Sequence, residues 1–152
     1  MKISDFLGKD RMMLELRSSD KDSLIKELAG CMKDAPGMKD FNGFVEDVFK
    51  REALASTAIG NNVAIPHART DAVKKFILAF GRSKKGIECN SLDGKPVKLF
   101  FLMGTPREED MSGYLKILAR LTRFLTKESF RELLLNAADP ATVIKTFILA
   151  EK

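Results

Sequence analysis

The chain is poor in the residues that form metal, redox or base-stacking sites. Its 152 residues include one histidine, two cysteines, one tyrosine and no tryptophan. Cys31 and Cys89 lie far apart, with no further cysteine or histidine at metal-ligand spacing, which argues against a zinc centre or a redox pair. We therefore expect two buried, reduced thiols, no metal and no cofactor.

Long apolar runs are also missing. The longest runs, residues 76–80 and 99–103, have the length of a strand, whereas a membrane span needs about 18 to 20 apolar residues. The first residues contain no apolar segment long enough for an export signal. These absences predict a cytoplasmic protein without membrane insertion.

Two common catalytic motifs are absent, and the charge pattern is diffuse. The sequence has neither a Gly-x-Ser-x-Gly nucleophile elbow nor a Gly-x-x-x-x-Gly-Lys phosphate loop. The net charge of +5 is spread over short doublets such as Lys74-Lys75 and Lys84-Lys85, and few aromatic residues are available for stacking on bases. We expect no nucleic-acid binding, a prediction that salt-dependent association with duplex DNA would test.

The composition present is that of a folded globular protein, with 45% hydrophobic and 31% charged residues. The length fits one domain over residues 1–152. Alternation of apolar residues from Met12 to Arg17 predicts a strand, and the apolar runs at 76–80 and 97–103 predict central strands covered on both faces.

Helical spacing accounts for most of the remaining chain. Ser19 or Asp20 can cap a first helix, and Asp40 and Asp139 can cap two others, with apolar residues recurring at helical spacing after each. A further long helix is predicted over residues 114–125, followed by a short one around 130–134. The fold class is therefore α/β, a single layered domain in which a mixed β-sheet is flanked by helices.

The single histidine, His67, lies where the pattern predicts the end of a brief strand over residues 63–65. Pro66 restricts the backbone and favours extended geometry at Ile65. Arg51 and Arg69 are candidates to flank His67, and guanidinium groups bind phosphoryl oxygens in a two-pronged manner. Because neutral imidazole is abundant near pH 7, this set of residues suits phosphoryl transfer.

Residues 51–67, REALASTAIGNNVAIPH, carry a specific resemblance. They resemble the active-site signature of fructose/mannitol-type IIA domains of the bacterial phosphoenolpyruvate:sugar phosphotransferase system (PTS), a family that includes nitrogen-regulatory IIA proteins. Residues 20–24, 93–97 and 114–121 are similar to further blocks of the family in the same order. The resemblance covers nearly the whole chain.

The resemblance implies that His67 is the phosphoryl acceptor, through Nε2, and that Arg51 stabilises the phosphoryl group. The implied partners are an HPr-like phosphocarrier protein as donor and, as recipient, a IIB protein or a regulated target protein. Arg69 is added only because it lies close to His67 in the sequence, and it could equally be an exposed, solvated arginine. The oligomeric state is left open.

Three positions depart from the family pattern. Ala58 and Asn62 replace glycines, and Asn62 tolerates a left-handed backbone better than most residues. Tyr114 stands where many members have a second histidine; it can donate a hydrogen bond to a phosphoryl oxygen, or it can simply cover an apolar face. Its presence favours a regulatory member over a transport component. The alternative is a regulatory binding module that is not phosphorylated and acts by docking.

Overall fold

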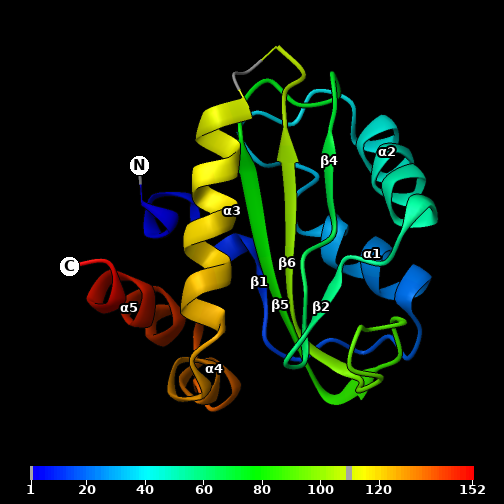
Figure 1. Cartoon of the computed structure of the whole chain (residues 1–152). Coiled ribbons are helices and arrows are strands. Elements are labelled where there is room, and N and C mark those ends of the chain that lie inside the picture. Colours follow the sequence, from blue (N-terminus) through cyan, green and yellow to red (C-terminus); the bar gives the residue numbers. More distant parts are fainter. Residues whose placement is uncertain (1, 109–110) are drawn as a thin grey trace.

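The computed structural model describes residues 2–108 and 111–152. Over this part of the chain the helices and strands follow one another from the N-terminus to the C-terminus (Figure 1). They are the 3-10 helices η1 (Ile3–Phe6) and η2 (Lys9–Arg11), the α-helices α1 (Lys21–Gly30), α2 (Phe41–Leu54), α3 (Met111–Leu125), α4 (Glu128–Leu135) and α5 (Pro140–Ala150), and the strands β1 (Met12–Met13), β2 (Ala58–Gly60), β3 (Val63–Ala64), β4 (His67–Arg69), β5 (Ile77–Ile87) and β6 (Val97–Thr105).

One mixed sheet forms the centre of the molecule, with strand order β1-β5-β6-β3-β2 and β4 also paired to β6. The long strands β5 and β6 are antiparallel, whereas β3 and β4 run parallel to β6. Both β3 and β4 therefore pair with β6, and in this register His67 lies opposite Met103. The sheet confirms the predicted α/β class with a mixed sheet.

Helices cover both faces of the sheet (Figure 1). The side chains of Leu78 and Phe80 enter the core beneath α3, α4 and α5, whereas those of Ile77 and Ala79 enter the core beneath α1 and α2. This alternation along one strand explains why the sequence shows a continuous apolar run rather than alternation with polar residues.

Aspartates begin three of the helices, and at α1 the structure selects Asp20 over Ser19 as the cap. The Asp20, Asp40 and Asp139 carboxylates accept hydrogen bonds from the backbone N–H groups of the third residue of α1, α2 and α5, respectively. Each satisfies one of the unpaired donors at a helix N-terminus. The predicted turn over residues 91–94 is also present, with Gly94 N donating to Ser91 O at 3.0 Å.

The segment from β2 to β3 contains two of the departures from the family pattern, Ala58 in β2 and Asn62 in the turn that follows. Gly60, Asn61 and Asn62 have φ angles of 94°, 56° and 66°. Asn62 also donates from Nδ2 to the Pro96 carbonyl at 2.7 Å. Ala58, by contrast, is a buried β2 residue outside the left-handed region, so alanine introduces no backbone strain there.

The two ends of the described chain are joined. The backbone N–H groups of Ile3 and Ser4 donate to the Glu151 carboxylate at 2.7 and 2.9 Å. Within residues 2–108 and 111–152, no helix combines the length and apolarity needed to cross a bilayer.

Three local predictions need correction. His67 does follow a brief strand, β3, but it also begins a further strand, β4, which the sequence did not indicate. The strand predicted from Met12 to Arg17 is only two residues long, because after Met13 only Leu16 donates a backbone hydrogen bond to β5, at Arg82. Cys31 is only half-buried, whereas Cys89 is buried as expected.

Candidate functional site

Three elements bring the residues singled out in the sequence to one cavity. β4 supplies His67 and Arg69, the last turn of α2 supplies Arg51, and the first turn of α3 supplies Tyr114. The cavity has a volume of about 420 Å³. It is lined by Asp47, Lys50, Arg51, Leu54, His67, Ala68, Arg69, Arg107, Met111 and Tyr114.

The imidazole of His67 is oriented by the backbone. Its Nδ1 lies 2.9 Å from the carbonyl oxygen of Ile65, two residues earlier. Because a carbonyl oxygen only accepts hydrogen bonds, Nδ1 carries the proton in the neutral ring. The lone pair of the neutral imidazole is therefore on Nε2.

The surroundings of His67 favour its neutral form. Burial lowers the pKa of His67 below its usual value of 6.5, and the positive charge of Arg51 acts in the same direction. The hydrogen bond to Ile65 and the carboxylate of Glu52 oppose this shift. The net effect keeps a nucleophilic imidazole available near neutral pH.

Arg51 is held at the end of α2. Its Nη1 donates to the Ala55 carbonyl at 2.9 Å, just beyond the last helical residue. Its charge lowers the pKa of His67 and also opposes the increase that burial causes in the pKa of Tyr114. Because Arg51, His67 and Tyr114 line the same cavity, the guanidinium is a candidate to meet an anion bound to His67.

Tyr114 packs beside His67, with ring centroids 5.9 Å apart and an interplanar angle of 47°. Its ring also lies against the core beneath α3, so it covers an apolar face as one reading of the sequence expected. Its hydroxyl group, however, is buried without a hydrogen-bond partner among the residues that the structure describes. An unpaired buried hydroxyl costs free energy, so packing alone does not account for a tyrosine here in place of phenylalanine.

Arg69 lies on the rim of the cavity and is exposed. Its Nη2 donates to the Arg107 carbonyl at 2.8 Å, and Arg107 itself lies 3.9 Å from Asp71. Arg69 and Arg107 therefore add positive charge to the rim, together with Lys50. Against these cations and Arg51, Asp47 is the one carboxylate among the described residues that line the cavity.

Glu52 supports the site, a role that the sequence did not reveal. It is buried, and its carboxylate accepts hydrogen bonds from Thr57 N at 3.2 Å, from the Thr57 hydroxyl, and from Lys21 Nζ at 3.2 Å. Glu52 thus fixes the end of α2 to the segment that leads into β2. The available signal was a glutamate next to Arg51 inside the resembling segment.

All residues of the site lie within the part of the chain that matches a protein family. The family model described as "Phosphoenolpyruvate-dependent sugar phosphotransferase system, EIIA 2" matches residues 5–150. The chain belongs to this family. This confirms the resemblance read from residues 51–67.

Relatives of this IIA family member carry both transport and regulatory names. The fructose-specific EIIA component of Haloferax volcanii is 37% identical over 143 residues, covering 93% of this chain and 91% of that protein. The nitrogen regulatory protein of Bradyrhizobium diazoefficiens is 31% identical over 149 residues, covering 98% and 96%. The fructose-specific EIIABC component of Bacillus subtilis is 36% identical over 144 residues, 95% of this chain, and the chain spans 22% of that longer protein.

Solved structures of IIA proteins share the fold. The nitrogen regulatory protein IIA-Ntr of Neisseria meningitidis superposes with a TM-score of 0.88 and 29% identity, covering 95% of this chain and 98% of that one. The mannitol IIA of Escherichia coli, in complex with phosphorylated IIB, gives a TM-score of 0.80 at 20% identity, covering 96% and 98%. The second likeness concerns the fold alone.

Proposed function

We propose that residues 1–152 act as one phosphoryl-carrier domain of the phosphotransferase system. Nε2 of His67 accepts a phosphoryl group from an HPr-like phosphohistidine protein. The group then passes to a IIB protein, or its presence controls a regulated target protein. The observation that carries this proposal is the contact between Nδ1 of His67 and the Ile65 carbonyl, which leaves the Nε2 lone pair free within a cation-lined cavity.

The transfer step requires no group beyond the two imidazoles. The Nε2 lone pair of His67 forms a bond to phosphorus as the bond between phosphorus and the donor's ring nitrogen breaks, and that bonding pair stays with the donor. In-line positioning and positive charge around the equatorial oxygens are the main requirements of such a step. The reverse sequence of bond changes transfers the group to the next protein.

The cavity supplies that positive charge. Arg51 is the residue proposed to hold the phosphoryl oxygens, because its charge already influences the His67 ring. Arg69, Arg107 and Lys50 contribute a weaker, more exposed field. The buried hydroxyl of Tyr114, which has no partner among the described residues, is proposed as a neutral donor to a phosphoryl oxygen.

The rim of the cavity is suited to protein partners. Leu54 is 82% exposed and Met111 is 38% exposed, and both line the cavity that contains His67. Exposed apolar side chains beside a reactive group provide a surface on which a phosphocarrier protein can dock. We expect donor and recipient to use this surface in turn.

The alternative function is a docking module that is not phosphorylated. The same exposed Leu54 and Met111 favour it, because they would serve a regulated target protein equally well. In this reading Tyr114, which stands where many family members have a titrating histidine, takes no part in phosphoryl transfer. The alternative differs from the carrier in one observable, the covalent state of His67.

Incubation with phosphoenolpyruvate, enzyme I and HPr tests the proposal. The carrier acquires one acid-labile phosphoryl group by intact mass, and the His67→Ala variant does not. A chain that stays unmodified while it binds a target protein supports the docking module instead. Labelling that persists in His67→Ala excludes the proposed acceptor.

A further inference from the structure

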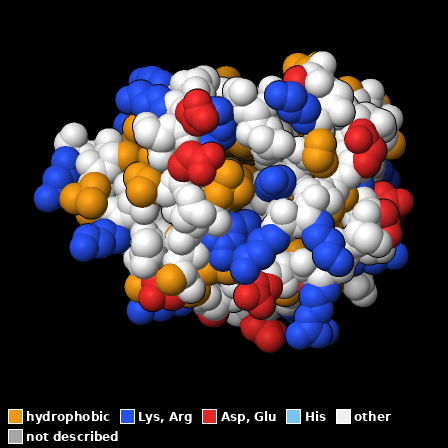
Figure 2. All heavy atoms as spheres, turned by 90° about the horizontal axis from the view of Figure 1, so that it is seen from below, with side chains coloured by type: hydrophobic (Ala, Val, Ile, Leu, Met, Phe, Trp, Pro, Cys, Tyr) orange, Lys and Arg blue, Asp and Glu red, His pale blue; other side chains and the backbone are white. Residues whose placement is uncertain are grey.

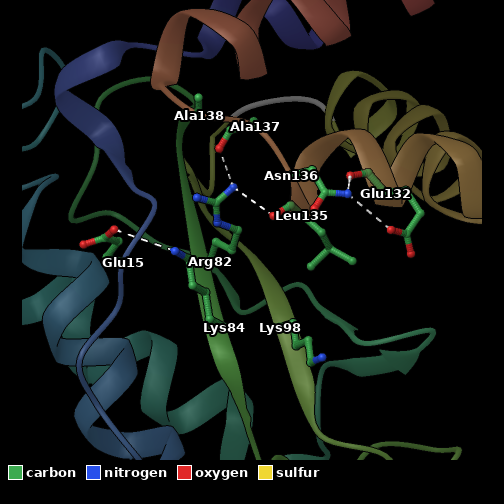
Figure 3. Close-up of a pocket in the computed structure, with 9 residues that line it drawn as sticks. All are labelled: Glu15, Arg82, Lys84, Lys98, Glu132, Leu135, Asn136, Ala137 and Ala138. Carbon is green, nitrogen blue, oxygen red and sulfur yellow. Dashed lines mark hydrogen bonds and ion pairs between the residues drawn. The ribbon is translucent and has the colours of Figure 1, made fainter.

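The charged residues beside β5 have a structural role. Charged side chains of both signs are mixed over the face of the molecule shown in Figure 2. In a cavity of about 600 Å³ beside β5, Nη1 of Arg82 donates to the Leu135 and Ala137 carbonyls at 3.2 and 2.8 Å (Figure 3). Glu15 and Glu132 line the same cavity. Arg82 thus holds the connection between α4 and α5 in place, and the residues with a further bearing on chemistry lie around His67.

His67 and Arg51 come from two elements that pack against each other. His67 begins β4, and Arg51 lies in the last turn of α2, which lies beside β4 in Figure 1. Arg51 donates to the carbonyl of Ala55, and no hydrogen bond joins it to His67 in the described parts of the chain. The distance between the guanidinium and the imidazole is therefore set by how α2 is fixed to β4.

A side-chain hydrogen bond fixes α2 to the end of β4. The Thr70 hydroxyl group donates to Oδ2 of Asp47, with 2.5 Å between the two oxygen atoms. Asp47 lies four residues before Arg51, on the same face of α2, and both residues line the cavity that contains His67. Thr70 directly follows Arg69, the last residue of β4. One hydrogen bond thus links the face of α2 that carries Arg51 to the strand that carries His67.

Thr70 is itself held firmly. It is 0% exposed, and its backbone N–H donates to the Thr105 carbonyl at 2.8 Å. Its Oγ1 accepts a hydrogen bond from the backbone N–H of Ala72 at 3.0 Å. A hydroxyl group has only one proton, and here that proton is directed to Asp47. Asp47 therefore meets a donor whose position is fixed by β6 and by the backbone that follows β4.

The other ends of α2 are held by different contacts. The Ala72 carbonyl accepts hydrogen bonds from the backbone N–H groups of Lys39 and Asp40, both at 2.9 Å, and Asp40 caps α2. At the far end of the helix, Glu52 is bonded to Thr57, which leads into β2 rather than β4. The hydrogen bond of Asp47 therefore acts one helical turn before Arg51 and connects that part of α2 to the β4 side of the cavity.

We propose that Asp47 and Thr70 are positioning residues for phosphoryl transfer, which hold the Arg51 guanidinium at the distance from His67 that a phosphoryl group bridges. This inference rests on the proposed carrier function. Transfer depends on accurate placement of the groups around the phosphoryl oxygens, so a small displacement of Arg51 slows it. Neither positioning residue needs to contact the phosphoryl group.

The charge of Asp47 and its role as an acceptor have opposite effects on transfer. As an anion in a cavity lined mainly by cations, Asp47 repels the phosphoryl group. As the acceptor of the Thr70 hydrogen bond, it favours transfer by fixing α2. Variants that change one property at a time therefore separate positioning from electrostatics.

Single-turnover transfer from phosphorylated HPr tests the proposal. Thr70→Val removes the donor without changing any charge and should slow transfer to His67 about tenfold, whereas Thr70→Ser keeps the hydroxyl group and should stay within about twofold of the normal rate. In an Arg51→Gln background, Thr70→Val should cost less than about twofold, because the hydrogen bond acts through Arg51. An equal loss in both backgrounds, or no loss in either, overturns the proposal.

Asp47 provides a second pair of variants at a half-buried position, should Thr70→Val not fold. Asp47→Asn keeps an acceptor for Thr70 and should transfer within about threefold of the normal rate, whereas Asp47→Ala should be about tenfold slower. Glu46→Gln and Glu46→Ala, at the exposed neighbouring position, are the matched controls and should transfer normally. Equal slowing by Asp47→Asn and Asp47→Ala would assign the effect to charge and contradict the positioning role.

An NMR titration of the His67 ring tests the hydrogen bond without phosphorylation. Displacement of Arg51 removes part of the charge that lowers the pKa of His67, and the opposing charge of Glu52 is unchanged in the Thr70 variants. The pKa of His67 should therefore be higher in Thr70→Val than in the wild type, and no higher than in Arg51→Gln, whereas Thr70→Ser should match the wild type. An unaltered pKa in Thr70→Val overturns the positioning role. If the pKa rises as expected but the wild-type chain accepts no phosphoryl group, the hydrogen bond holds Arg51 as inferred and only the carrier function fails.

Discussion

Nδ1 of His67 lies 2.9 Å from the carbonyl oxygen of Ile65, so the short connection between β3 and β4 also sets the tautomer of the histidine. Pro66 stands between the two residues and limits the rotation of the backbone that joins them. The contact directs the proton to Nδ1 and the lone pair to Nε2. The proposed chemistry of the site follows from this relationship.

Arg51→Gln should slow phosphorylation of His67 by about 10- to 100-fold, because one charged hydrogen-bond donor to the phosphoryl oxygens is lost. Single-turnover transfer from phosphorylated HPr measures the effect. Arg17→Gln, an exposed arginine outside the His67 cavity, is the matched control and should transfer at the normal rate. Equal rates for the two variants would remove Arg51 from the proposed mechanism.

The His67 ring should titrate below its usual pKa of 6.5 in the folded protein, because burial and Arg51 disfavour its charged form. In Arg51→Gln the pKa of His67 should rise. NMR follows this titration without overlap, since the chain has one histidine. A folded-state pKa above 6.5, or no rise in the variant, contradicts the described surroundings.

The same shift makes a prediction about stability. His67 binds a proton more readily in the unfolded chain than in the folded chain. The contribution of neutral His67 to the free energy of unfolding is therefore complete above about pH 6.5, and it declines as the pH falls below this value. Compared with His67→Gln, the wild-type chain should therefore lose more unfolding free energy between about pH 7 and pH 5. Urea unfolding at several pH values checks the sign, and a parallel decline in both proteins would contradict it.

Tyr114→Phe separates packing from hydrogen bonding. Removing a buried hydroxyl that has no partner should leave the free energy of unfolding unchanged or raise it by up to about 1 kcal/mol. Phosphorylation should nevertheless slow by about two- to tenfold, because a donor to the phosphoryl group is lost. Circular dichroism during urea unfolding and single-turnover transfer measure the two effects, and an unchanged transfer rate would leave Tyr114 as a packing residue.

Glu52→Ala should destabilise the fold by about 2 to 4 kcal/mol, because it leaves Thr57 and Lys21 without their buried acceptor. Urea unfolding measures the loss. Glu46→Ala, on the same helix and exposed, is the control and should change stability by less than about 0.5 kcal/mol. A small effect at Glu52 would mean that the end of α2 is held by other contacts.

Much of the fold was predictable because its signals are local. Asp20, Asp40 and Asp139 each precede a helix that begins where the sequence indicated. The strand at β1 was predicted too long, since its pairing depends on β5, which is distant in the sequence. The pairing of β4 with β6 was missed for the same reason, and it placed His67 at the start of a strand.

The candidate site was predictable as a set of residues but not as an arrangement. The sequence singled out His67, Arg51, Arg69 and Tyr114, and all four line one cavity. The buried acceptor role of Glu52 and the unpaired hydroxyl of Tyr114 depend on burial and on partners from other elements. Such properties become visible only when α2, α3 and β4 are brought together.

The most direct test of the central claim is ¹⁵N and ³¹P NMR of the imidazole after phosphorylation by phosphoenolpyruvate, enzyme I and HPr. With one histidine in the chain, the spectrum contains a single ring. The account predicts coupling between phosphorus and Nε2, with the proton retained on Nδ1. Coupling to Nδ1, or phosphate elsewhere in the chain, would contradict it.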